Sequence, residues 1–216
     1  MRDCCFRRRA GVVLALLAFC SLPRSARAAG VVLSDNITGV ASGGTEAATG
    51  STWLASSFGT GNATYEFDNV TLLLQNPVAG AAVVQIYTDG GLQPGSLVGT
   101  LTSPSSYLGP LVETTFTADG ITLAADSTYW VVLHATSGEF DWSWALGDSG
   151  TGIGFQDTWS QSTDGGSSWF TFVGPSSYPT QMIVTASVPE PGSLALLGLG
   201  TGLSWLWRRE RKGRRA

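Results

Sequence analysis

Lysine and arginine are absent from the long central part of this chain. All 12 basic residues of the 216 stand before residue 28 or after residue 207. Of the 16 acidic residues only Asp3, Glu190 and Glu210 lie outside 30–187, so this segment carries 13 carboxylates and a formal charge of −13. Nucleic acids and anionic lipid surfaces are bound through Lys and Arg, so we expect neither as a partner of the segment. Apolar burial and backbone hydrogen bonds must stabilise it.

Cysteine and histidine are almost as scarce. Cys4, Cys5 and Cys20 all fall in the first 20 residues, and His134 is the only histidine. The central segment therefore has no disulfide and cannot build a zinc site of the usual kind. No G-x-S-x-G turn accompanies His134, so a catalytic serine triad is not indicated. We predict no enzyme, no cofactor and no metal site. Calcium is a candidate counter-ion for the carboxylates, and a glycosidase built from two of them is an alternative.

Long helical periodicity is also missing between residues 30 and 187. Short β-branched or aromatic runs alternate there with clusters of Gly, Ser, Asp and Pro, a pattern typical of strands and turns. About nine strands at this spacing predict an all-β fold, a single β-sandwich of jelly-roll-like type spanning residues 29–187. The predicted strands are 52–58, 65–75, 81–88, 96–102, 112–117, 128–135, 140–144, 168–173 and 181–187.

The N-terminal segment has the three parts of a secretory signal peptide. A basic start at residues 7–9 precedes an apolar run over 10–19, and Ala26-Arg27-Ala28 fits the A-x-A cleavage pattern. We predict a signal helix within residues 1–28 and cleavage between Ala28 and Ala29. Signal peptidase and the export machinery are therefore expected partners.

The C-terminal segment, 188–216, combines three features in order. Pro189-Glu190-Pro191 comes first, an apolar stretch over 194–207 follows, and a basic end over 208–215 closes the chain. The prolines disfavour helix and sheet, so we expect an extended and protease-accessible hinge. The apolar stretch predicts a short transmembrane helix whose basic end stays cytoplasmic, which leaves the central domain outside the inner membrane.

These three features closely resemble the PEP-CTERM sorting signal. The resemblance implies that Pro189, Glu190 and Pro191 are read by an exosortase, a membrane-embedded processing enzyme. It also implies a transient inner-membrane anchor, followed by release or attachment at the cell surface. Proteins with this signal are typically associated with exopolysaccharide and biofilm matrix.

The central segment is similar to a bacterial surface domain called choice-of-anchor R. The resemblance is carried by 52–58, 70–74, 86–99 and 121–133. This family name describes attachment to the cell and implies no molecular activity.

Residues 162–169, Ser-Thr-Asp-Gly-Gly-Ser-Ser-Trp, fit the Asp-box pattern S-x-D-x-G-x-x-W known from sialidases and other β-propellers. We interpret it as a hairpin turn in which Asp164 accepts backbone N–H groups and Trp169 packs beneath. A sialidase site needs arginines for the substrate carboxylate, and this segment has none.

Phe140, Trp142 and Trp144 alternate along a predicted strand, so their rings would share one face. They are either core residues or a platform on which sugars stack. We therefore predict a non-catalytic surface or extracellular-matrix protein. The alternative is a carbohydrate-binding module that uses Trp53, Trp142 or Trp144 to contact extracellular polysaccharide.

Overall fold

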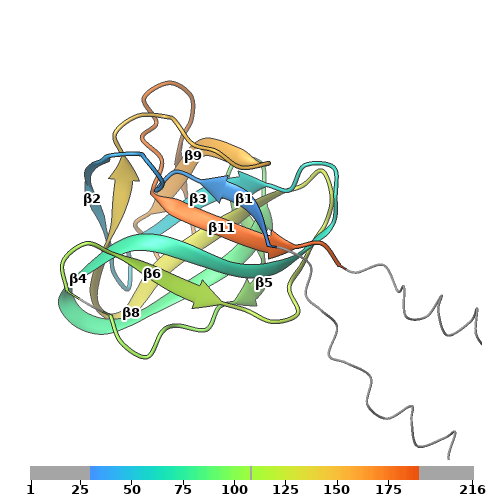
Figure 1. The fold of residues 1–216 in the computed structure, drawn as a ribbon. Helices are drawn as coiled ribbons and strands as arrows, with labels where there is room; N and C mark the ends of the chain where they lie inside the picture. The colour runs from blue at the N-terminus through green and yellow to red at the C-terminus, as the bar shows by residue number, and fades with distance from the viewer. Residues whose placement is uncertain (1–29, 108, 190–216) are drawn as a thin grey trace, which may run out of the picture.

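The computed structural model describes residues 30–107 and 109–189, which form an all-β domain (Figure 1). This part of the chain contains no helix, and so none that could cross a membrane. The predicted signal helix and transmembrane helix lie outside the described residues. The strands are β1 (Val31–Asp35), β2 (Ser42–Ala48), β3 (Trp53–Gly59), β4 (Tyr65–Asp89), β5 (Pro94–Thr100), β6 (Val112–Thr117), β7 (Thr122–Leu123), β8 (Thr128–Ala145), β9 (Phe155–Ser162), β10 (Phe170–Phe172) and β11 (Met182–Ser187).

Strands β4 and β8 form a long antiparallel ribbon through the middle of the domain. β4 has 25 residues and β8 has 18, and they pair from Leu74 with Trp142 to Thr88 with Tyr129. The sequence predicted two strands in place of each, and that prediction is wrong because both strands continue through the expected turns. β1, β2, β7 and β9 were not predicted, whereas the predictions for β3, β6 and β11 are confirmed to within one residue.

Glycine bends this ribbon without ending its strands. The register between β4 and β8 shifts three times between Gln75 and Ala82. A Cβ on residue 80 would lie 1.9 Å from the Ser137 carbonyl oxygen, and Gly138 has a φ of 71°. Only glycine allows so close an approach and this backbone conformation, so the paired strands turn a corner together.

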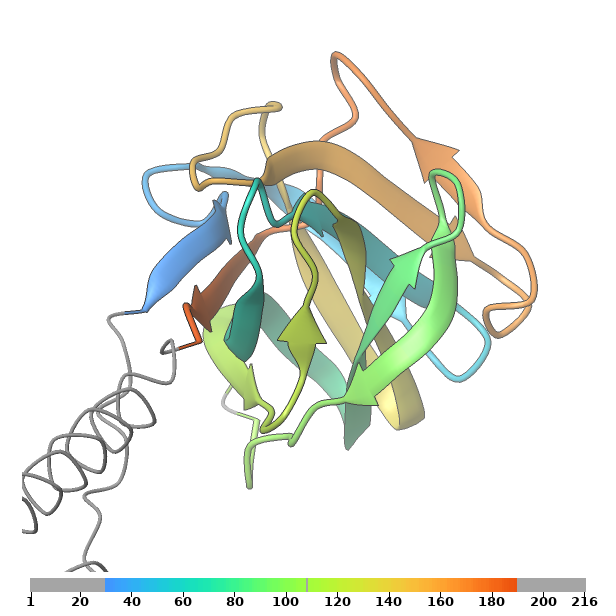
Figure 2. The same ribbon diagram turned by 90° about the vertical axis from the view of Figure 1, so that its right-hand side faces the viewer.

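The other strands flank the two arms of the bent ribbon. β11, β6 and β7 pair with the first part of β4, and β5 pairs with its last part. β3 and β2 pair with successive parts of β8, and β9 and β10 extend the sheet beyond β3. The strands thus form one continuous sheet folded around a core (Figure 2), an arrangement consistent with a β-sandwich. The jelly-roll-like connectivity stays a prediction.

Two apolar clusters lie on opposite faces of β3 and β8. Leu54 and Leu133 belong to the main core, whereas the adjacent Ala55 and Val132 belong to a smaller outer cluster around Trp130. This alternation follows the two-residue period of a strand. Trp53, Tyr87 and Trp169 pack against the outer cluster.

The first and last strands are neighbours. β1 pairs antiparallel with β11, and Val31 lies opposite Ala186. β11 is itself an internal strand, because its other edge pairs with β4. The described chain therefore enters and leaves the sheet at the same end of the domain (Figure 1).

A buried polar network holds the opposite end of β11. Gln181 is fully buried just before that strand. Its Nε2 donates to the carbonyl oxygens of Asn36 at 3.0 Å and Val40 at 3.2 Å, and its Oε1 accepts from Ser143 Oγ at 2.7 Å. The Asn36 side chain accepts from the Met182 N–H at 2.7 Å. One glutamine thus ties the β1–β2 loop to β8 and β11.

Candidate functional site

The folded domain ends immediately before the predicted processing motif. Ser187, the last residue of β11, is buried and its Oγ donates to Asp68 Oδ1 at 3.1 Å. Val188 is exposed, and Pro189 is the last described residue. Glu190 and Pro191 lie outside the described residues, as do Ala28 and Ala29 at the predicted signal-peptide cleavage site.

The predicted aromatic row does not form a common exposed face. Phe140 and Trp142 are fully buried in the main core, and Trp142 Nε1 donates to the Gln181 carbonyl oxygen at 2.7 Å. Trp142 therefore has no surface for a sugar, and its proposed role as a contact residue is wrong. Trp144 is only partly buried, and its ring lies on Gly43, where a Cβ would approach within 1.9 Å of the ring.

Trp53 is partly buried on the other side of the sheet. Its ring stacks on His134, with the centroids 4.1 Å apart and the planes 10° from parallel. The backbone of Gly166 lies against the same ring. Burial lowers the pKa of His134 below its ordinary value, so the imidazole is neutral at pH 7. Trp53 and His134 thus pack against each other under the Asp-box turn.

The structural interpretation of the Asp-box is confirmed. Asp164 Oδ1 accepts from the Ser168 N–H at 2.9 Å, Asp164 Oδ2 accepts from Ser168 Oγ at 2.6 Å, and Trp169 packs on the outer cluster. The Ser162 hydroxyl also donates to Asp164 Oδ1, at 2.8 Å. These hydrogen bonds, above all the one from the Ser168 hydroxyl, lower the pKa of Asp164 to about 2.

Several other carboxylates also accept backbone N–H groups in turns. Asp35 accepts from the N–H groups of Ile37 and Thr38, and Asp89 accepts from two turn N–H groups and from Trp130 Nε1. In a segment without Lys or Arg, backbone amides and side-chain donors take the place of cations as partners for these anions. Within residues 30–107 and 109–189, no three His, Cys, Asp or Glu side chains are grouped to hold a metal ion.

Asp148 organises the loop that leads into β11. Its carboxylate accepts from the backbone N–H groups of Ser176, at 2.5 Å, and Tyr178, at 3.2 Å. Both loop residues have positive φ, 68° and 53°, a conformation that side chains disfavour unless their surroundings hold it. The hydrogen bond from the Ser176 N–H is the main cause that lowers the pKa of Asp148. This carboxylate therefore holds the backbone of Tyr178 in place.

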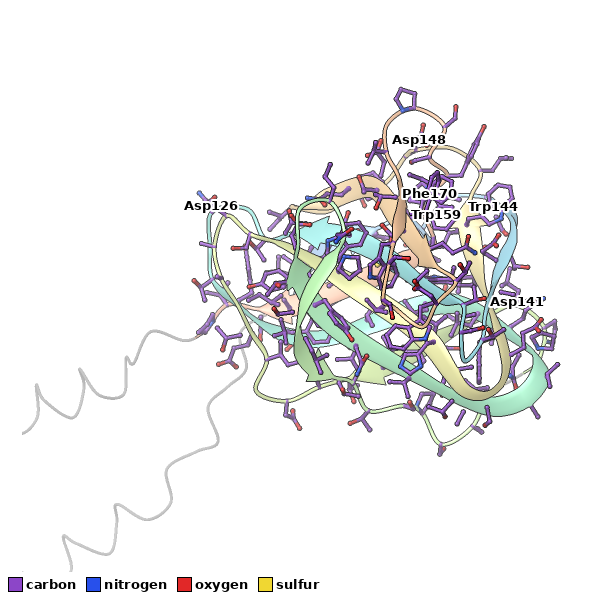
Figure 3. All side chains as sticks on the ribbon, turned by 180° about the vertical axis from the view of Figure 1, so that it is seen from behind. Asp126, Asp141, Trp144, Asp148, Trp159 and Phe170 are labelled. Atoms are coloured by element: carbon purple, nitrogen blue, oxygen red, sulfur yellow. The ribbon has the colours of Figure 1, made fainter. Side chains whose placement is uncertain are left out.

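Five aromatic side chains, which we call the aromatic patch, gather at this end of the domain. Trp159 on β9 stacks on Phe172 of β10 at 4.2 Å, and Phe170 meets Phe172 edge-on at 4.8 Å. Trp144 contacts Tyr178 at 5.7 Å. Figure 3 shows Trp144, Trp159 and Phe170 in the same region of the domain. Of these five residues only Trp144 was predicted from the sequence as a contact residue, because β9 was not predicted and the pairing of Trp159 with Phe172 depends on that strand.

The two halves of the aromatic patch are joined through the loop before β11. Trp159 Nε1 donates to the carbonyl oxygen of Ser177, the residue before Tyr178. Among the large apolar side chains that are exposed in the described chain, the only aromatic ones are Phe170, 67% exposed, and Tyr178, 40% exposed. Phe170 and Tyr178 thus present the accessible rings of the patch, and Trp144 and Trp159 are partly buried.

A polar pair borders the patch. Gln161 lies directly opposite Phe170 in the β9–β10 pairing, so the two side chains share a face. Gln161 Nε2 donates to Glu46 Oε1 at 3.0 Å. The side-chain oxygen and the second N–H of Gln161, and the second carboxylate oxygen of Glu46, can bind other partners.

Comparison with known proteins identifies one region of the chain. Residues 187–212 match the model of the PEP-CTERM protein-sorting motif. A search of curated proteins found no match, and the resemblance of the central segment to choice-of-anchor R stays a prediction. The chain carries a PEP-CTERM sorting motif that begins at the last residue of β11, which indicates an exported protein that is anchored in the membrane, processed by an exosortase and then exposed at the surface.

Proposed function

We propose that the chain is a non-catalytic surface or extracellular-matrix protein that acts outside the cell as a β-sandwich domain and associates with exopolysaccharide or biofilm. The observation that carries this proposal is the position of the two predicted cuts relative to the sheet. β1 begins at Val31, just after the Ala28–Ala29 bond, and β11 ends at Ser187, just before Pro189.

Processing at these two places leaves the sheet complete. Every strand of the described residues lies between the predicted cuts, and β11 keeps its pairing with both β1 and β4. Removal of either terminal segment therefore leaves the pairing of the described strands in place. The start of β1 and the end of β11 lie side by side. If the C-terminus stays attached to the cell surface, the domain is therefore held at this one end.

The absence of catalysis is supported by how the reactive residues are used. His134 stacks on Trp53, and Asp35, Asp89, Asp148 and Asp164 accept hydrogen bonds within turns. A glycoside-active enzyme is the less favoured alternative. Release of reducing sugar from polysaccharide by the purified protein would establish it and would contradict the proposal.

The sorting part of the proposal is tested by replacing Pro189, Glu190 and Pro191 together with alanine. The apolar stretch and basic end can stop translocation by hydrophobic partitioning and charge without the tripeptide. We therefore expect the variant to reach the outer face of the inner membrane in a host with an exosortase, and to remain there with its tail. Membrane fractionation and immunoblotting measure this.

The matched control replaces Val188, Gly192 and Ser193 with alanine and keeps the tripeptide. This control should be processed like the parent. If the Pro189–Pro191 variant is cleaved and released as efficiently as the parent, the tail is an ordinary stop-transfer anchor and the proposal fails.

A second candidate function, carbohydrate binding, is favoured by the exposed rings of the aromatic patch. Exposed aromatic clusters on a soluble domain mark interaction sites. Of the contact residues expected from sequence, Trp144 belongs to this patch and Trp53 does not.

A further inference from the structure

We propose that the aromatic patch is a binding site for an uncharged polysaccharide and that Phe170 and Tyr178 are its principal contacts. The inference deepens the proposed function and rests on it for the extracellular location of the domain.

The composition of the patch supports a ligand that combines apolar faces with hydroxyl groups. The C–H groups on the faces of a pyranose ring match the electron-rich faces of aromatic rings. The remaining acceptors of Glu46 and Gln161, which border Phe170, suit hydroxyl donors. A polymer of neutral sugars offers both kinds of group in every unit.

The charge of the domain narrows the class of ligand. Residues 30–187 carry 13 carboxylates and no Lys or Arg, and Glu46 and Asp148 lie beside the patch. Anionic polysaccharides, nucleic acids and anionic lipids would be repelled. Two copies of the domain would repel each other for the same reason, so self-association through the patch is disfavoured.

The position of the patch leaves it accessible when the domain is held by its C-terminus. Tyr178 precedes β11 and Thr180 bridges to Trp144, whereas the sorting motif follows the other end of β11. A six-residue strand spans roughly 20 Å. Figure 3 accordingly shows Trp144 and Phe170 on the side of the domain that is remote from the start of β1 and the end of β11.

The patch is also pre-organised. Trp159 is fixed between Phe172 and the Ser177 carbonyl oxygen, and Asp148 fixes the backbone of Tyr178. Rings held in place before binding lose little conformational entropy when a ligand arrives.

The test is affinity electrophoresis of the full-length protein in mild detergent. Native gels contain hydroxyethyl cellulose, dextran or galactomannan as neutral probes, and alginate as the anionic probe. We expect at least one neutral polysaccharide to retard the protein through Phe170 and Tyr178. The full-length chain carries 12 basic residues at its two ends, so any retardation by alginate should be independent of these two rings. Replacing Phe170 and Tyr178 together with alanine should raise the dissociation constant at least about tenfold.

The control is Leu97→Ala, which removes a side chain that is 53% exposed on β5, outside the patch. It should bind like the parent, and equal thermal midpoints of all variants exclude misfolding. The proposal is overturned if no neutral gel retards the protein, if alginate retards it equally through the same two rings, or if the double variant binds like the parent. It is also overturned if the two rings are needed for binding poly-lysine and not for any neutral gel, since that result assigns the patch to a basic partner. The assay uses purified chain, so a failure of processing does not affect it.

Discussion

Gln181 offers the most quantitative test of how the domain is held together. Replacing it with alanine removes a fully buried side chain that makes three hydrogen bonds, to Asn36, Val40 and Ser143. A buried polar group left without a partner costs about 1–3 kcal/mol. Ser143 Oγ keeps Ser42 Oγ as a partner at 2.7 Å, so the loss comes mainly from the two carbonyl oxygens. We expect a destabilisation of about 3 kcal/mol.

The assay is thermal and urea unfolding of the secreted protein, monitored by tryptophan fluorescence. For a domain of this size, about 3 kcal/mol corresponds to a fall in the thermal midpoint of roughly 10 °C. The matched control is Gln85→Ala. Gln85 is only partly buried, its Nε2 donates to Thr100 Oγ1 in an exposed hydrogen bond, and its Oε1 accepts from the Tyr87 hydroxyl. The control should lose less than about 1 kcal/mol. Equal losses for the two variants would refute the role given to the buried network.

Two further predictions concern charge. Because 13 carboxylates face no Lys or Arg in the central segment, sodium chloride should raise the thermal midpoint by screening repulsion. Equal midpoints in low and high salt would contradict this. Calcium is the candidate counter-ion, and a rise beyond that given by sodium chloride at matched ionic strength would establish specific binding. The pKa of Asp164 is lowered to about 2, so its stabilisation is present above its ordinary pKa of 3.8 and is lost as pH falls toward 2. Asp164→Asn should therefore weaken the dependence of stability on pH between 4 and 2, and an unchanged acid unfolding curve would count against the turn's role.

The sequence was most informative where a structure depends on local chemistry. The Asp-box turn was predicted with its acceptor and its packed tryptophan, because both follow from residues within eight positions of each other. The sorting motif was predicted for the same reason. Strands β3, β6 and β11 were found because their apolar runs are bounded by turn residues.

The features that were predicted wrongly or not at all depend on contacts between residues far apart in the sequence. Gly80 and Gly138 are typical turn signals, yet they meet across the β4–β8 ribbon and bend it, so the predicted strand breaks were wrong. Whether Trp142 or Trp144 is exposed depends on which strands pack opposite β8 in the folded sheet. The alternation of residues along β8 alone does not specify these strands. The aromatic patch joins β8, β9, β10 and the loop before β11, and no local pattern brings these segments together.

The central claim is that two cuts release one complete folded domain. Intact-mass spectrometry of the mature protein from a host with an exosortase tests it directly. The account predicts an N-terminus at Ala29 and a C-terminus within or next to Pro189–Pro191, with every strand from β1 to β11 retained. A mature protein that still carries residues 194–216, or one cut before Ser187, would contradict it.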